Sequence, residues 1–366
     1  MTNHQMSDKR NVYYSDPLAY LIAERLHLSP ITTGLFSIPF VTALYLLTAL
    51  VSNTLWSIPR QVGLLQDWIP WVAAILVSPV VLGYYLWSFQ AINNVIQNLI
   101  ASDVVEIDEL EIEKIVAELY SERWRNLLAL SSAIGFSIFV FATQTRLDKS
   151  WTGSGLLPNL SVTLATFIVV YAGSKLVLNQ ISNIQILHRI LRRKQLNLNP
   201  LHPDRCGGLR PLSDYSIKTA YLVAILGAWV GIVGYQIITQ GSNQDYWYVG
   251  LTVVLYVSIS VACFFGPLLT AHRGMQKAKE SLLHDISQQF WADYSQIRNS
   301  LNEDAEILKK KTEKIRELRA FYTITDEFPV WPFDIQTFRR YLLTIPTPFL
   351  APLFGLLQKY SEILLK

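Results

Sequence analysis

Six windows of the chain contain no Asp, Glu, Lys or Arg. They cover residues 26–59, 68–102, 126–145, 150–174, 219–240 and 246–272. A helix needs about 20 apolar residues to cross the hydrocarbon core of a bilayer, whereas a helix on a soluble core keeps a polar face for water. The pattern therefore predicts an all-α, polytopic membrane bundle with six spans, near 31–52, 69–89, 126–144, 159–180, 219–239 and 246–270.

A seventh apolar window, 341–358, is shorter and contains Pro346, Pro348 and Pro352. Proline lacks an amide hydrogen and disfavours a straight helix. We expect this segment to be re-entrant, interfacial or packed against the bundle, within a C-terminal membrane-associated region at 336–366.

Lys and Arg are divided unevenly between the connections. The first, third and fifth connections carry three of them, whereas the N-terminal arm and the second and fourth connections carry twelve. Cytoplasmic loops are enriched in Lys and Arg, so the bias predicts that both termini are cytoplasmic. Tryptophans at the opposite boundary fit an aromatic belt: Trp56, Trp68, Trp71, Trp151 and Trp247.

The predicted organisation has an arm at 1–30, a six-span domain at 31–271 and a cytoplasmic helical region at 272–335. In the arm, Asp16 before Pro17 is typical of a helix start, and we interpret it as an interfacial helix leading into the first span. Two helices separated by a break near 299–303 are expected after the sixth span. They form either a helical hairpin on the membrane domain or an oligomer seam.

The two long cytoplasmic connections carry opposite charge. Residues 103–125 hold eight carboxylates and three cations, a net −5, whereas 181–216 hold six cations and two carboxylates, a net +4. One hypothesis is that the connections meet and neutralise each other. In the alternative they are solvated, or the basic run contacts anionic lipid headgroups through Arg189, Arg192, Arg193 and Lys194.

The stretch 199–210, NPLHPDRCGGLR, is the most distinctive loop of the chain. Two prolines fix its backbone, and the Gly pair permits a sharp turn. It is interpreted as a rigid turn or as an anion or headgroup site, built from His202, Asp204, Arg205, Gly207 and Gly208. A metal site with Cys206 is the third reading, but no second ligand cluster supports it.

This loop resembles one in a family of bacterial multi-pass membrane proteins of uncharacterised activity. The family pattern is HPD followed by a pair of small residues and GGL, and it matches His202, Pro203, Asp204, Gly207, Gly208 and Leu209, with Pro332, Phe333 and Asp334 downstream. The resemblance covers about residues 195–350. It implies a multi-pass protein of the bacterial inner membrane but no activity, and Cys206 stands where a small residue is usual.

Composition narrows the function. The chain is 51% hydrophobic and 16% charged, with a net charge of +3, which disfavours a nucleic-acid-binding surface. Lys175 is the one charge clearly inside a predicted span, and we expect it to snorkel to the cytoplasmic boundary. The predicted topology keeps Cys206 and Cys263 apart, so no disulfide is expected. No phosphate loop, HExxH or GxSxG motif is present, and we assign no cofactor, metal or catalytic residue.

Three functions are compatible with these features. A non-enzymatic membrane scaffold or signalling component with a charged helical cytoplasmic face is favoured, because the chain lacks a catalytic set. The alternatives are an oligomeric channel or transport-type conduit, and a membrane enzyme using His202 and Asp204. The expected partners are the bilayer and anionic lipid headgroups, and homo-oligomerisation is left open.

Overall fold

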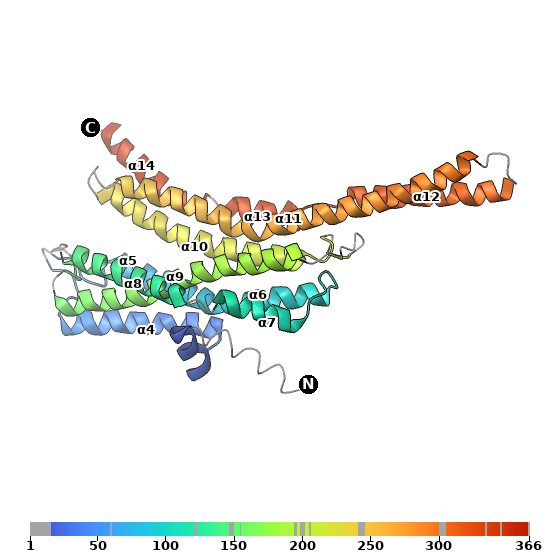
Figure 1. The fold of residues 1–366 in the computed structure, drawn as a ribbon. Helices are drawn as coiled ribbons and strands as arrows, with labels where there is room; N and C mark the ends of the chain where they lie inside the picture. Colours follow the sequence, from blue (N-terminus) through green and yellow to red (C-terminus); the bar gives the residue numbers. More distant parts are fainter. Residues whose placement is uncertain are drawn as a thin grey trace.

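The computed structural model describes residues 16–58, 61–120, 123–145, 150–153, 155–193, 196–197, 202–204, 206–240, 246–299, 305–333, 335–344 and 346–364. Every regular element in these residues is a helix, which confirms the predicted all-α class. Most of the helices run along the long axis of one elongated bundle, and a hairpin projects from one end of it (Figure 1).

The elements in chain order are α3 (Pro17–Tyr20), the π-helical turn η1 (Leu21–Arg25), α4 (Pro30–Val51), α5 (Trp68–Val72), the π-helical turn η2 (Ala73–Val77), α6 (Ser78–Ala101), α7 (Glu109–Tyr120), α8 (Arg123–Gln144), α9 (Leu156–Arg193), α10 (Arg210–Gln240), α11 (Tyr246–Asn299), α12 (Ala305–Glu327), α13 (Ile335–Thr344) and α14 (Thr347–Leu364).

Five helical segments of the described residues are long and apolar enough to cross a membrane. They are Pro30–Val51, Trp68–Ala101, Leu110–Gln144, Leu156–Arg192 and Arg210–Ile232, and each contains or overlaps one of the first five predicted spans. The sixth predicted span forms the first half of α11. Several helices are longer than a bilayer requires: the 38 residues of α9 reach about 57 Å, against a hydrocarbon core of about 30 Å.

The outer surface of the bundle is apolar and its helix contacts are close. Phe36, Leu47 and Leu127 are more than half exposed, as lipid-facing side chains are. At the α4–α6 contact, a Cβ on Gly34 would lie 2.7 Å from the carbonyl oxygen of Pro79. Small residues let membrane helices approach each other this closely.

The N-terminal arm packs into the bundle. Asp16 begins α3 as predicted, accepting from the amides of Leu18 and Ala19, but its side chain is completely buried. Its carboxylate lies 3.2 Å from the ammonium of Lys175. The prediction of a snorkelling Lys175 is wrong, because its ammonium is buried against the Asp16 carboxylate. The interfacial placement of the arm stays a prediction.

A layer of polar side chains continues from this ion pair across the bundle. Arg125 is 2% exposed, and its guanidinium donates to the Leu119 carbonyl at 2.6 Å and to Asn179 Oδ1 at 2.7 Å. Asn179 in turn donates to Ser88 Oγ at 2.8 Å. Lys175 lies about 29 Å along α9 from Leu156, which is close to the thickness of the hydrocarbon core of a bilayer.

Beyond this layer the acidic and basic connections meet, as one hypothesis predicted. α7 packs against the end of α9, and Arg189 forms an ion pair with Glu118 at 3.0 Å. At the opposite end of the bundle, Trp56 and Trp68 are exposed, but Trp151 is buried and donates to Asp67 Oδ2 at 3.3 Å. Trp151 therefore does not belong to an aromatic belt.

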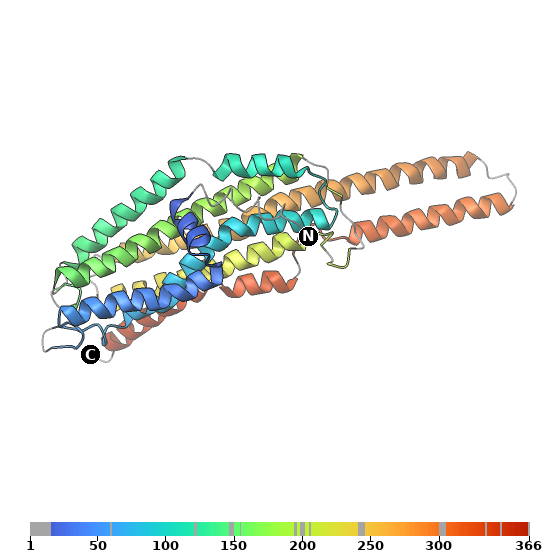
Figure 2. The same ribbon diagram turned by 90° about the horizontal axis from the view of Figure 1, so that it is seen from below.

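α11 and α12 form an antiparallel helical hairpin, joined across the predicted break. The ammonium of Lys314 lies 2.8 Å from Asp293, and that of Lys279 lies 3.6 Å from Asp326. The hairpin extends beyond the ends of the other helices in both views (Figures 1 and 2). The sequence analysis did not predict that the sixth apolar segment and the first hairpin helix would be one uninterrupted helix of 54 residues.

The C-terminal apolar segment packs along the bundle, which was one of its three expected placements. Tyr341 stacks on Phe264 with ring centroids 3.8 Å apart. Further along the chain, the Tyr235 hydroxyl donates to Gln358 at 3.1 Å. Because Tyr235 lies near the end of α10, α14 runs towards the end of the bundle that is opposite the projecting hairpin (Figure 2).

Candidate functional site

The Asp204 carboxylate organises the HPD loop. It accepts hydrogen bonds from the amides of Cys206 at 2.9 Å and Gly208 at 2.9 Å, and from that of Arg210 at 3.3 Å. Arg210 is the first residue of α10, where unpaired amides favour a nearby negative charge. His202 Nδ1 lies 2.7 Å from Asp204 Oδ1. The carboxylate is thus used to hold the loop and to begin α10.

The two glycines of the loop have backbone conformations that disfavour other residues. Gly207 has φ +65° and Gly208 has φ +91°. A Cβ on Gly208 would lie 2.4 Å from Cγ2 of Val104, in the connection after α6. The amide of Asn197 donates to the Val104 carbonyl at 3.0 Å. The loop is therefore fixed against the end of α6 as well as to α10.

Hydrogen bonding sets the ionisation of Asp204. Partial burial acts to raise the pKa of its carboxyl, but the amides of Cys206 and Gly208, with His202 and Arg210, outweigh burial and hold the pKa below its ordinary value. Since the folded-state pKa is depressed, the carboxylate stabilises the fold above about pH 4. This stabilisation is lost as the pH falls through the folded-state pKa.

We expect Asp204→Ala to lower the free energy of unfolding at pH 7 by about 1–3 kcal/mol, because several amides lose their acceptor. Asp204→Asn keeps one acceptor oxygen and should lose less. Thermal unfolding combined with hydrogen exchange at Cys206 and Gly208 measures both effects. Equal amide protection in wild type and Asp204→Ala would contradict this role for the carboxylate.

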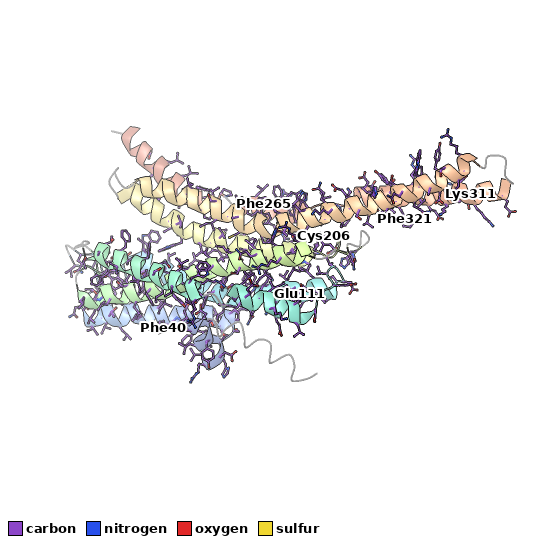
Figure 3. The ribbon with its side chains drawn as sticks, in the orientation of Figure 1. Phe40, Glu111, Cys206, Phe265, Lys311 and Phe321 are labelled. Atoms are coloured by element: carbon purple, nitrogen blue, oxygen red, sulfur yellow. The ribbon has the colours of Figure 1, made fainter. Side chains whose placement is uncertain are left out.

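A pocket of about 1460 Å³ adjoins the loop, between the end of α9 and α11. Its lining is polar and charged on both sides. The residues that line it are Ala101, Ser102, Asp103, His188, Leu191, Arg192, Leu196, Asn197, His202, Thr270, Arg273, Gly274, Gln276, Lys277, Ala278, Glu280, Ser281, Leu282 and Asp285. The loop end near Cys206, the end of α9 and the middle of α11 lie at the base of the projecting hairpin (Figure 3).

The structure brings only some of the predicted site residues to this pocket. His202 and Arg192 line it, whereas Asp204, Gly207 and Gly208 hold the loop beside it. Arg189 does not reach the pocket and pairs with Glu118 instead. The side chain of Arg193 is not described, and Lys194 and Arg205 lie outside the described residues.

Metal and disulfide chemistry find no geometric basis in the described part of the chain. No group of three or more His, Cys, Asp or Glu there could hold a metal ion. Cys206 and Cys263 are both free thiols. Cys206 is buried in the loop that Asp204 organises. Its thiol is therefore poorly placed to serve as a ligand, which weakens the hypothesis of a metal site in this loop.

Sequence reasoning missed three residues of the pocket: His188, Arg273 and Lys277. Arg273 and Lys277 are spaced four apart on α11 and therefore share a face, and Arg273 is the first charge after the sixth apolar window. His188 and Arg192 have the same spacing on α9. These two pairs, both beyond the ends of predicted spans, were the available signal.

Comparisons with known proteins identify no relative, so a functional assignment depends on the geometry of the loop and the pocket. A scan against protein-family models gives no match, and searches of curated proteins and of solved structures give no significant match.

Proposed function

We propose that the protein is a membrane-anchored, non-enzymatic scaffold or signalling component that presents the α11–α12 hairpin in the cytoplasm. The observation that carries this proposal is the single helix α11, which continues from the apolar bundle into the hairpin. Because α11 continues as one helix through this course, with Pro267 inside it, the bundle and the hairpin share a single element.

Exposed aromatic side chains on the hairpin support a docking role. Trp291 is 65% exposed and Tyr294 44% on α11. Phe321 is 58% exposed on α12, where Figure 3 labels it. Isolated exposed apolar residues are ordinary, but aromatic residues are enriched where proteins bind each other. The ion pair between Asp293 and Lys314 sets the register of the hairpin and places Trp291 and Phe321 about 8 Å apart along its axis.

The proposed orientation follows the distribution of Lys and Arg. It places six spans in a bacterial inner membrane, with the N-terminal arm and the hairpin on the cytoplasmic side. The course of α14 then carries its end towards the outer side, so a cytoplasmic C-terminus is not part of the proposal. Lipids surround the bundle, and homo-oligomerisation is not required.

The alternatives have less support from the described residues. An enzyme using His202 and Asp204 would need a carboxylate free to act on substrate, but Asp204 is bonded to the backbone of its own loop. A channel would need polar side chains around a lumen. Those of the buried layer bond instead to one another, as between Asn183 and Tyr215 at 3.0 Å.

Photo-crosslinking in intact cells tests the docking role. We expect a photoreactive residue at position 291 or 321 to give the same discrete protein adduct, because both positions are exposed at similar levels along the hairpin. Position 56, which is equally exposed at the other end of the bundle, is the control and should give no such adduct. Ion flux through liposomes of purified protein, with no adduct at 291 or 321, would favour the channel instead.

A further inference from the structure

α9 and α11 lie side by side in a parallel register that repeats every four residues. A Cβ on Gly266 would meet Cδ1 of Ile184 at 2.8 Å. One turn further along both helices, His188 Nδ1 lies 3.4 Å from Thr270 Oγ1. The next turn places Arg192 level with Gly274, since each helix advances about 6 Å over four residues.

Two further cations flank Gly274. Arg273 precedes it in the chain, and Lys277 follows nearly one turn later on α11. Arg192, Arg273 and Lys277 all line the pocket, and all three are exposed. None of them has an ion-pair partner among the described residues. Three neighbouring positive charges repel one another, so an anion bound between them would lower the free energy of this arrangement.

Three carboxylates also line the pocket, and two of them lie beyond the cations on α11. Glu280 and Asp285 lie further along α11, and Glu280 accepts a hydrogen bond from Gln276 at 3.0 Å. Asp103, after α6, also lines the cavity and forms no ion pair in the described part of the chain. Along α11 itself the charge changes sign, from Arg273 and Lys277 nearer the bundle to Glu280 and Asp285 nearer the hairpin tip.

We infer that this pocket binds a phosphate-bearing ligand, whose phosphate oxygens contact Arg192, Arg273 and Lys277. Arg and Lys are the side chains that proteins use for phosphate, and His188 and Thr270 add hydrogen-bonding groups at the same end. The volume exceeds the roughly 300–1,000 Å³ of ordinary small-molecule sites, so a nucleotide-sized molecule or a lipid headgroup fits better than a single ion. This inference does not depend on the docking role of the hairpin.

Calorimetric titration of inorganic pyrophosphate tests the soluble source. The full-length protein is held in nanodiscs of phosphatidylcholine alone, so that no anionic lipid competes. We expect saturable binding that weakens as salt is raised, and at least tenfold weaker binding for Arg273→Gln/Lys277→Gln. Lys309→Gln/Lys310→Gln removes the same charge from exposed positions on α12 and should leave the affinity within twofold of wild type.

A second arm tests the lipid source. Thermal unfolding is compared in nanodiscs with and without phosphatidylglycerol. If pyrophosphate fails to bind but phosphatidylglycerol raises the midpoint for wild type and the α12 control, and not for Arg273→Gln/Lys277→Gln, the phosphate belongs to a lipid headgroup. Absence of both effects, or identical effects in all three proteins, would overturn the inference. The unfolding midpoint of each variant without ligand shows that it is folded.

Discussion

Asp16→Asn is expected to lower the free energy of unfolding by about 3–5 kcal/mol, because it leaves the Lys175 ammonium buried without its counter-charge. Both side chains of this pair are at most 1% exposed. The Asn side chain retains an oxygen that can accept from the amides of Leu18 and Ala19, so the start of α3 is preserved. The loss of unfolding free energy therefore reports on the missing negative charge and not on the capping of α3.

Two further variants complete this test. In Asp16→Asn/Lys175→Met no charge remains unpaired, so we expect the double variant to recover much of the lost stability. Lys314→Gln breaks an exposed pair, whose Lys side chain is 54% exposed, and should change stability by no more than about 1 kcal/mol. Unfolding in mixed micelles by rising denaturant measures all three. Equal losses for Asp16→Asn and Lys314→Gln would show that Lys175 reaches water.

Gly208→Ala should disrupt the HPD loop through two separable effects. A left-handed backbone conformation costs a non-glycine residue about 1–3 kcal/mol, and the added Cβ would lie 2.4 Å from Val104 Cγ2. Gly208→Ala/Val104→Ala removes the clash but keeps the backbone cost. We therefore expect the double variant to lose less free energy of unfolding than the two single variants lose in total.

Gly135→Ala is the matched control, because no atom lies within 4 Å of its added Cβ on α8. It should be neutral or slightly stabilising, as alanine favours helix over glycine. Thermal unfolding and proteolytic cleavage within 196–210 report the outcome. A Gly208→Ala protein with wild-type melting and cleavage would mean that the loop relaxes without cost.

Local composition was enough to predict the apolar helices, but it could not predict which distant charges meet. The first five spans follow from charge-free windows, since each window is a property of one contiguous segment. The pairing of Asp16 with Lys175 joins parts of the chain that are far apart in sequence. A lone Lys near the end of a span ordinarily snorkels, so nothing local distinguishes Lys175 from that common case.

The candidate site was also predictable only in part, because local sequence marks some of its residues but not the contacts between distant segments. His202 and Arg192 stood out because their loop and basic run are unusual in sequence. Arg273 and Lys277 were overlooked because a charged turn after a span is typical of a solvated face. Only the α9–α11 register places them beside Arg192, and that register depends on Gly266 and Gly274, where side chains of α9 and its following segment pack closely.

The uninterrupted course of α11 has a mechanical consequence. From Arg273 to Asn299 the helix extends about 39 Å past the first charge that follows its apolar half. A tilt of only about 5° at Arg273 would move the hairpin tip sideways by about 3–4 Å, so α11 acts as a lever that converts small rotations among lipid-facing helices into displacements large enough to make or break a contact in solution.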